Sequence, residues 1–366
     1  MKITQINPQR LLISGQPSKE NISEIIDLLQ VDKLFTLDFA EVESLDFSVL
    51  RALLNAHQQG YRFRIVNVSD AVAILFETGG ITQHIPICRK PVHISMDDYE
   101  QSGDGYTALS YNHRDGDSMM KLYYDFVPME VIEQEKCIAT AALQMGIPTP
   151  MAGPIVTDGK RFGVSFERIA NKKSFARAIA DTPTLLEPLA HTFAQMCKKL
   201  HATPCNTEIF PSVKDFYTGI IQRSIYINDA EKSKALDFLC HVPDNTTCLH
   251  GDLHIGNVIT NGTDNLFIDM ADFRYGNPLF DIGLMYLVSH NNEREMTMKL
   301  FHISNETFLA FWKIFITDYF GITDDRALAK KEEEIKPFAA LKLLHFGELS
   351  KHLSENKLAA VKRWLC

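Results

Sequence analysis

Four polar residues in the second half of the chain have the types and the spacing that phosphoryl transfer requires. Asp252 stands two residues after His250, Asn257 follows five residues later, and Asp269 ends an apolar run. Transfer of a γ-phosphoryl group needs a carboxylate that orients and deprotonates the attacking hydroxyl, and oxygen ligands for the Mg²⁺ that bridges the phosphates. We therefore expect Asp252 to be the catalytic base and Asn257 and Asp269 to be the metal ligands.

A short β-hairpin is expected between the two proposed metal ligands. Residues 258–260 and 266–268 have strand character, and Asn261-Gly262 is typical of a tight turn. A hairpin of this length brings its two ends together. One Mg²⁺ can then contact both Asn257 and Asp269.

The pattern His-Gly-Asp-Leu-His-x-x-Asn, followed by Ile-Asp, resembles the aminoglycoside phosphotransferase-like branch of the protein-kinase-like fold. That branch also includes choline-kinase-like and other small-molecule kinases, whereas protein kinases usually have arginine in place of Gly251. The resemblance implies a bilobal fold with a β-rich N-lobe and a helical C-lobe. It also implies ATP and Mg²⁺ as cofactors.

Two charged residues far upstream complete the expected nucleotide site. Lys121 lies in an apolar, strand-like run over residues 119–122, where an unpaired charge is costly, so it should face a phosphate or a carboxylate. Glu135 is the expected partner, ahead of Glu130 and Glu133 on the same helix, which is predicted from about residue 128 to 145. This helix and the Gly-Ile-Pro-x-Pro after it resemble the corresponding part of the same kinases.

Weaker patterns indicate further ATP contacts. Gly103 and Gly105 lie in residues 102–106, between two strand-like runs, where backbone N–H groups can approach phosphate. Two glycines make a turn equally well, and the third glycine of the protein-kinase loop is absent. In the family, the strand predicted over residues 162–169 leads to a hinge that binds adenine. The resemblance therefore implies that Glu167 and Ile169 contact ATP through their main chain.

Downstream of the metal ligands, a Gly-x-Pro-x-x-Asp run ends at Asp281. We expect Asp281 to open a helix and to brace the catalytic loop through backbone hydrogen bonds, so that it supports the site together with His250. Asp272 can approach a second metal, the substrate or water. His201 is expected to be a buried, hydrogen-bonded histidine and not a catalytic residue.

The first 88 residues alternate between strand-like and helix-like patterns that are independent of the kinase motif. They predict a small α/β sheet faced by helices. The predicted strands cover residues 11–14, 35–39 and 61–65, and the predicted helices cover residues 22–29, 50–57 and 72–76. Asn21 and Glu24 can form a capping box at the start of the first helix. Gly60 and Gly79-Gly80 are expected to end the second and third helices.

This region resembles a STAS domain, the fold of anti-sigma factor antagonists, over most of residues 8–87, and the resemblance centres on residues 37–40 and 45–50. Phosphorylated members of that family have Asp-Ser-Ser or Asp-Ser-Thr where this chain has Asp46, Phe47 and Ser48. Because Phe47 occupies the place of the usual serine, we expect a docking role more than a phosphorylation switch, although Ser48 or Ser44 could take the place of that serine. Ser48 is expected to cap a helix N-terminus. The docking partner is the kinase part, a second copy of the chain or another protein.

Length and composition predict how the chain is divided into domains and what class of protein it is. The 366 residues predict three parts: a STAS-like domain at 1–88, a kinase-like N-lobe at 89–169 and a helical C-lobe at 170–366. An apolar fraction of 45% and a charged fraction of 23% are those of an ordinary soluble protein. The net charge of −9 argues against nucleic acid as a partner. The N-terminus lacks a signal-peptide pattern and no apolar run approaches membrane-spanning length, so we expect a cytoplasmic protein without a membrane partner.

The sequence thus predicts an ATP- and Mg²⁺-dependent kinase of a small hydroxylated molecule behind a STAS-like docking or regulatory domain. A protein kinase, a non-catalytic nucleotide-binding module of the anti-sigma antagonist type and a GTP-using enzyme remain alternatives. The C-terminal helices expected at residues 306–319 and 326–353 should wall the acceptor pocket. Carboxylates in that pocket would favour a cationic acceptor, and arginines would favour an acid.

Overall fold

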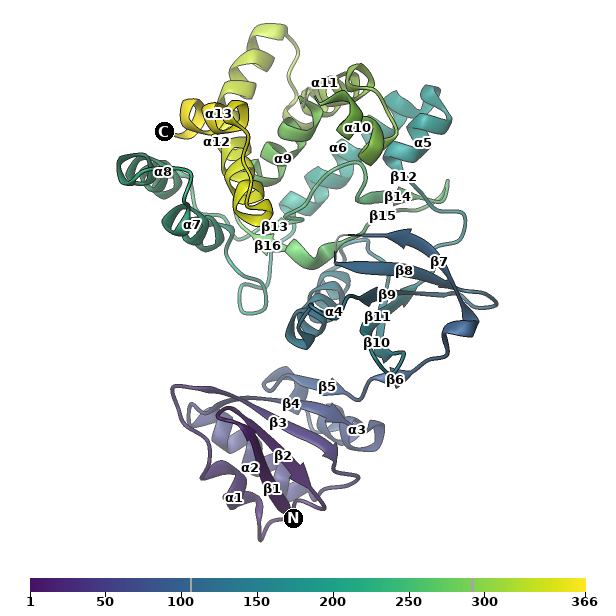
Figure 1. The fold of residues 1–366 in the computed structure, drawn as a ribbon, viewed down its shortest axis with the longest axis vertical. Helices are drawn as coiled ribbons and strands as arrows, with labels where there is room; N and C mark the ends of the chain where they lie inside the picture. The colour runs from purple at the N-terminus through teal and green to yellow at the C-terminus, as the bar shows by residue number, and fades with distance from the viewer. Residues whose placement is uncertain (106, 291–292) are drawn as a thin grey trace. The chain divides into compact units, whose positions relative to one another are not determined.

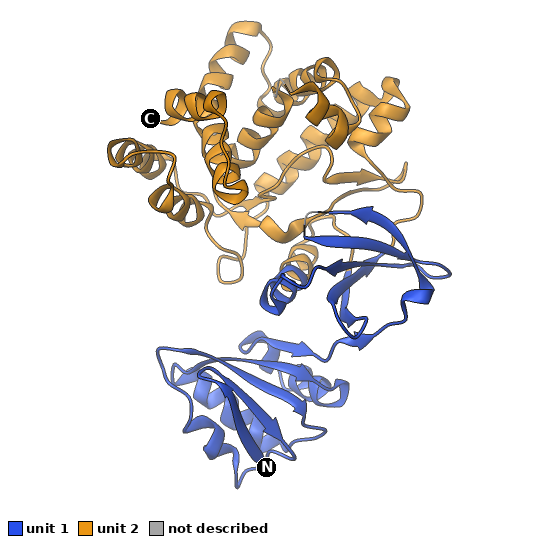
Figure 2. Ribbon diagram, viewed as in Figure 1, with its two compact units in different colours: residues 1–136, 152–167 blue, residues 137–151, 168–366 orange. Residues whose placement is uncertain are grey.

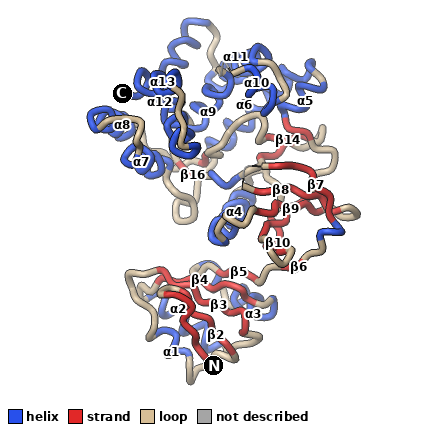
Figure 3. Tube along the Cα trace, viewed as in Figure 1, coloured by secondary structure: helices blue, strands red, loops and turns tan. Residues whose placement is uncertain are grey.

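The computed structural model describes residues 1–105, 107–290 and 293–366 (Figure 1). The chain divides into two compact units, residues 1–136 with 152–167 and residues 137–151 with 168–366 (Figure 2). Strands dominate the first unit and helices dominate the second (Figure 3). Because the first unit contains both the N-terminal sheet and the next one, the predicted domain boundary at residue 88 stays a prediction.

The N-terminal sheet has five strands in the order β1-β2-β3-β4-β5. Strands β2 to β5 are parallel, and β1 runs antiparallel to β2. The strands are β1 (Lys2–Asn7), β2 (Arg10–Ser14), β3 (Leu34–Glu41), β4 (Arg62–Val68) and β5 (Ile87–Arg89), and the helices are α1 (Ile22–Ile26), α2 (Phe47–Gln58), α3 (Asp70–Thr78) and the 3₁₀ turn η1 (Ile81–Gln83). The predicted α/β pattern is confirmed, and β1 and β5 are additional strands.

Alternation along β3 explains why the sheet has one apolar and one polar face. Phe35, Leu37 and Phe39 are buried in a core that also contains Leu50 and Leu53 of α2. Successive side chains of a strand point to opposite faces, so the residues between them form a second face. That second face is polar, and it contacts helix α4, as described below.

Two local predictions for this region are wrong. Asn21 does not cap α1 with its side chain, because its Oδ1 accepts a hydrogen bond from the Ser18 N–H at 2.8 Å. The predicted capping box with Glu24 is therefore absent, and α1 ends at Ile26 instead of reaching residue 29.

Ser48 also differs from its expected capping role. Helix α2 begins at Phe47, whose side chain is exposed. Ser48 is therefore the second residue of the helix and does not precede it. The Ser48 hydroxyl is buried and makes no hydrogen bond with the described residues. Ser48 therefore does not cap α2, since its side chain turns toward the core.

The second sheet has six strands in the order β6-β10-β11-β9-β8-β7. Its strands are β6 (Val92–His93), β7 (Tyr99–Asp104), β8 (Ala108–His113), β9 (Ser118–Tyr123), β10 (Ala152–Thr157) and β11 (Phe162–Glu167), accompanied by the 3₁₀ turn η2 (Met96–Asp98). Helix α4 (Met129–Gln144) follows β9 and agrees with the predicted helix within a residue at each end. Tyr106, at the end of the predicted glycine-rich segment, lies outside the described residues.

The second unit is mainly helical. Its helices are α5 (Phe175–Asp181), α6 (Leu186–Ala202), α7 (Val213–Arg223), α8 (Asp229–His241), α9 (Leu279–Ser289), α10 (Arg294–Phe301), α11 (Asn305–Phe320), α12 (Asp325–Ser350) and α13 (Glu355–Leu365), with 3₁₀ turns η3 (Pro183–Leu185) and η4 (Met270–Asp272). Its strands are β12 (Lys173–Ser174), β13 (Cys248–Leu249), β14 (Val258–Thr260), β15 (Asn265–Phe267) and β16 (Arg274–Tyr275). The antiparallel pair β14 and β15 confirms the predicted hairpin. In the described part of the chain, no helix is long and apolar enough to cross a membrane.

Candidate active site

His250 fixes the loop that carries Asp252. Its side chain is fully buried between β13 and the hairpin. The ring donates from Nε2 to the carbonyl of Ile268 at 3.0 Å, so Nδ1 is left to accept the Asp252 N–H at 3.3 Å. The histidine thus joins the catalytic loop to the end of β15 and holds the backbone of Asp252 in place.

Asp281, in the first turn of α9, is the main anchor of the same loop. Its carboxylate accepts the N–H of His250 at 2.7 Å and the N–H of Gly251 at 2.8 Å. His201 Nε2 donates a third hydrogen bond at 3.1 Å. Burial alone would raise the pKa of Asp281, but the hydrogen bonds from His201 and from the loop lower it below its ordinary value. Asp281 therefore stays ionised at neutral pH and holds the loop as an anion.

The residue before Asp252 has to be glycine. Gly251 has a φ of +81°, and a Cβ built there would overlap the carbonyl oxygen of Asp272. Both facts exclude side chains at this position. The carbonyl of Gly251 accepts a hydrogen bond from the Lys342 ammonium at 2.7 Å, so a residue of α12 also holds the loop.

Asn257 sets the direction of the Asp252 carboxylate. Its amide Nδ2 donates to the Asp252 carbonyl and to Asp252 Oδ2, both at 3.0 Å. The amide oxygen of Asn257 accepts no hydrogen bond from the described residues, although the residue is almost fully buried. An amide oxygen left open beside a carboxylate is a ligand that suits Mg²⁺.

Asp269 lies at the same end of the hairpin as Asn257. The N–H of Ile268 donates to the carbonyl of Asn257 at 2.9 Å, which closes the hairpin immediately before Asp269. Asp269 has a φ of +58°, a conformation that is uncommon for residues other than glycine and that turns the chain sharply after β15. No cluster of three or more His, Cys, Asp or Glu side chains with metal-binding geometry exists among the described residues. The donor set for a metal here is one amide and one carboxylate, both hard oxygen ligands, and it fits Mg²⁺.

The electrostatic surroundings keep Asp252 ionised. Partial burial would raise the pKa of this carboxyl, but the charges of His254 and Lys342 and the hydrogen bond from Asn257 lower it. The His254 Nε2 and the Lys342 Nζ each lie 3.7 Å from a carboxylate oxygen of Asp252. Asp252 is therefore an anion that can accept a hydrogen bond from a hydroxyl.

Lys121 and Glu135 lie together in the first unit. The ammonium of Lys121 on β9 donates to Glu135 Oε1 on α4 at 2.9 Å, and Glu135 is buried. The two rival carboxylates face elsewhere, because Glu130 and Glu133 both form ion pairs with Arg64 of β4. The geometry thus selects Glu135 as the partner of Lys121.

The remaining residues predicted to contact ATP lie in the six-stranded second sheet or just after one of its strands. Gly103 is in β7 opposite Ser110, and the N–H of Gly105 donates to the Ala108 carbonyl at 2.9 Å, which closes the turn. That hydrogen bond occupies the N–H that was expected to face phosphate. Glu167 is the last residue of β11, so the predicted strand ends two residues before Ile169.

Some residues around the loop were not predicted from the sequence. Lys342 is the clearest of them, since it is almost fully buried on α12. It stands inside an apolar run at residues 338–344, a signal of the kind that identified Lys121. Asp272, which had several open roles, pairs with Arg274 at 3.5 Å. His201 is buried and hydrogen-bonded, as expected, because its Nδ1 also meets the Tyr319 hydroxyl at 2.7 Å.

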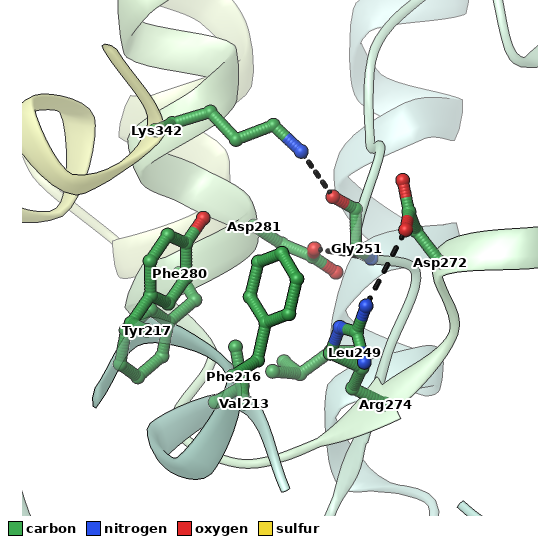
Figure 4. Close-up of a pocket in the computed structure, with 10 residues that line it drawn as sticks. All are labelled: Val213, Phe216, Tyr217, Leu249, Gly251, Asp272, Arg274, Phe280, Asp281 and Lys342. Atoms are coloured by element: carbon green, nitrogen blue, oxygen red, sulfur yellow. Dashed lines mark hydrogen bonds and ion pairs between the residues drawn. The ribbon is translucent and has the colours of Figure 1, made fainter. Parts of the chain in front are cut away.

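Beside the loop lies a hollow within the second unit (Figure 4). Helices α7, α9 and α12 and the segment from η4 to β16 form its walls. The residues that line it are Val213, Phe216, Tyr217, Leu249, Gly251, Asp272, Arg274, Phe280, Asp281 and Lys342. Because Gly251 precedes Asp252 directly, the hollow is next to the expected catalytic carboxylate.

One segment of the chain matches a protein-family model. Residues 176–308 match the model of the phosphotransferase enzyme family, which is less than half of the chain. The matched segment contains Asp252, Asn257, Asp269 and Asp281, whereas Lys121 lies outside it. No curated protein gives a significant sequence match.

Solved structures with similar folds are distant in sequence. A choline/ethanolamine kinase family protein from Mesorhizobium loti is 14% identical, with 73% of this chain and 85% of that chain covered and a TM-score of 0.44. A thermostable mutant of aminoglycoside phosphotransferase APH(4)-Ia is 14% identical, with 73% and 94% covered and a TM-score of 0.48. APH(3'')-Id from Streptomyces rimosus, in complex with ADP and streptomycin, is 18% identical, with 64% and 89% covered and a TM-score of 0.42.

Proposed function

We propose that this protein is an ATP- and Mg²⁺-dependent phosphotransferase that acts on the hydroxyl of a small molecule. The observation that carries the proposal is the geometry around Asp252. Its ionised carboxylate is aimed by the Asn257 amide at 3.0 Å, and the oxygen of that amide is left for a metal. The phosphotransferase model that matches residues 176–308 supports the same chemistry.

The chemistry assigns one task to each residue. The acceptor oxygen forms a bond to the γ-phosphorus, the bond from that phosphorus to the β–γ bridging oxygen breaks, and ADP leaves. Asp252 orients the acceptor hydroxyl and takes its proton. Lys121, held by Glu135, binds the α- and β-phosphates. Bound Mg²⁺ would neutralise phosphate charge, and Asn257 and Asp269 would hold it.

Peripheral contacts to ATP belong to the same proposal. Gly103 of β7 and Gly105 just after it would lie near the phosphates, and Glu167 and Ile169 would contact adenine through their main chain. His250 and Asp281 support the loop and touch neither substrate. The site is compatible with a protein acceptor in principle, but no described feature favours one over a small molecule.

The metal assignment has a direct test. Asp269→Ala should remove Mg²⁺-dependent ATP turnover, because an amide alone is a weak ligand for a hard cation. We expect a loss of at least about 10²-fold in phosphate release, comparable to the removal of one electrostatic stabiliser. Asp264→Ala, in the exposed hairpin turn, is the matched control and should turn over ATP normally. Unchanged ATP turnover in Asp269→Ala would contradict the assignment of Asp269 as a Mg²⁺ ligand.

We also propose that the STAS-like residues 1–88 hold helix α4 in place. Arg64 of β4 donates to Glu133 at 2.6 Å and to Glu130 at 3.1 Å, while its Nε donates to Thr36 of the same sheet. Burial raises the pKa of Glu133, and the charge of Arg64 opposes that shift. Glu133 stands two residues before Glu135 on the same helix, so the sheet and the Lys121 partner are mechanically connected.

This docking role predicts a specific effect of Arg64→Ala. Loss of a partly buried ion pair costs about 1 kcal/mol, so we expect kcat/KM for ATP to fall about fivefold as Glu135 loses its fixed position. Arg89→Ala is the matched control, because its partners Asp70 and Glu77 both lie within the N-terminal sheet region. The double exchange Arg64→Glu with Glu133→Arg should recover most of the activity. Equal kinetics for Arg64→Ala and Arg89→Ala would contradict the docking role.

A further inference from the structure

Arg274 is a partly buried cation beside the loop that carries Asp252, and it has few partners among the described residues. Its side chain is 15% exposed, and its single hydrogen bond to the described residues is with Asp272 at 3.5 Å, the limit for such a bond. A guanidinium carries five N–H donors, and donors without a protein acceptor are available to a ligand or to water. The flat side of the group lies against the Phe216 ring, 4.0 Å from its centroid. Most donors of Arg274 therefore lack an acceptor in the described structure.

His345 adds a second polar group without a partner in the same place. Its Nδ1 is buried and makes no hydrogen bond among the described residues. Its ring contacts Phe216, with the centroids 5.0 Å apart. Burial and the nearby charges of Lys342, Arg274 and Arg223 together lower the pKa of His345 to about 4, against the opposing charge of Asp272. The surroundings of this ring are thus predominantly positive.

The hollow that Arg274 lines combines cationic groups with an aromatic wall, and Phe216 of that wall also contacts His345. Figure 4 shows Lys342 donating to Gly251 and Arg274 beside Asp272, around the same space. The second carboxylate of the hollow, Asp281, is already satisfied by the loop N–H groups and His201. Asp272 pairs with Arg274, and Lys342 lies 3.7 Å from a carboxylate oxygen of Asp252. Arg274 therefore has fewer printed partners than Lys342 among the described residues.

We propose that the phosphate acceptor carries a carboxylate, and that Arg274 binds this carboxylate while the acceptor hydroxyl lies at Asp252. This inference rests on the proposed function. A guanidinium fork matches a carboxylate in two parallel hydrogen bonds, which would satisfy the unpaired donors of Arg274. The rings of Phe216 and Tyr217 would pack on the carbon skeleton. The acceptor is then a small hydroxy acid, with its carboxylate at Arg274 and its hydroxyl at Asp252.

Matched pairs of acceptors test the carboxylate directly. Serine and ethanolamine differ by a carboxylate, and glycerate and glycerol differ by a carboxylate in place of a hydroxymethyl group. With Mg²⁺ and ATP, we expect ADP formation from the acid of a pair to show a kcat/KM at least tenfold above that of its partner. Arg274→Met should remove this preference by raising the KM for the acid at least tenfold, with the KM for ATP unchanged.

Two variants separate recognition from folding. Arg274→Lys keeps the charge but loses the fork, so it should retain a part of the preference for the acid. Arg294→Met, on the exposed side of α10, is the control and should behave like the wild type. Calorimetric binding of the same four compounds to the wild type and to Arg274→Met gives a readout that does not need turnover.

The outcomes of these experiments test the carboxylate-bearing acceptor separately from the proposed phosphotransferase function. If water alone satisfies Arg274, acid and alcohol members bind and react alike, and the inference is wrong. A preference for ethanolamine over serine would also overturn it, as would the absence of any Arg274-dependent binding of the acids. The proposed function fails separately, when Mg²⁺-dependent ATP turnover is insensitive to Asp269→Ala.

Discussion

Asp252→Asn should lower phosphate transfer about 10²- to 10⁴-fold, the range by which a positioned general base accelerates a reaction. The replacement keeps the shape of the side chain and one oxygen that can accept the hydrogen bond from the Asn257 amide, so the loop should hold its position. It removes the charge that attracts the hydroxyl proton. Because the nucleotide phosphates are assigned to Lys121, the affinity for ATP should change little. Initial rates of ADP formation and ATP titration measure the two effects.

Asp237→Asn is the matched control for this experiment. Asp237 lies on the exposed side of α8, with three quarters of its side chain accessible. Its replacement should leave both turnover and ATP binding at the level of the wild type. A result in which Asp252→Asn retains more than about a tenth of the wild-type turnover would mean that another group takes the proton.

The sequence was sufficient where a residue acts within a short segment. The spacing from His250 to Asp269 is local, so the hairpin that joins Asn257 to Asp269 followed from turn chemistry and strand alternation. The pair Lys121 and Glu135 followed from the cost of a buried charge, because a lysine in an apolar strand needs a carboxylate nearby. In these cases one physical rule chooses among few alternatives.

The sequence was insufficient where tertiary packing supplies the partner. Lys342 reaches Gly251 across 91 positions of the chain, and no local pattern states which backbone carbonyl a buried lysine will meet. No sequence pattern distinguished Arg274, because its place against the ring of Phe216 depends on helix α7. The capping box at Asn21 failed for a related reason, since a competing turn took the side-chain oxygen.

Asp281→Ala should have the largest effect on stability. The change removes one acceptor from three buried donors, the N–H groups of His250 and Gly251 and the ring of His201. Breaking such a buried ionic network by deleting one partner costs about 3–5 kcal/mol. Both tryptophans, Trp312 and Trp364, belong to the second unit, so their fluorescence during urea unfolding follows the unit that holds the site.

The dependence on pH identifies the cause of that loss. The folded-state pKa of Asp281 lies below its ordinary value of 3.8, so its contribution to stability is complete above that pH and is lost as the pH falls through the folded-state pKa. The difference in unfolding free energy between wild type and Asp281→Ala should therefore be constant from pH 7 to about pH 5 and should shrink below about pH 4. Asp237→Ala should show neither the loss nor this pH dependence. A difference that persists unchanged in acid would indicate lost packing instead of a lost anion, and an unfolding free energy equal to that of the wild type would remove Asp281 as the anchor of the loop.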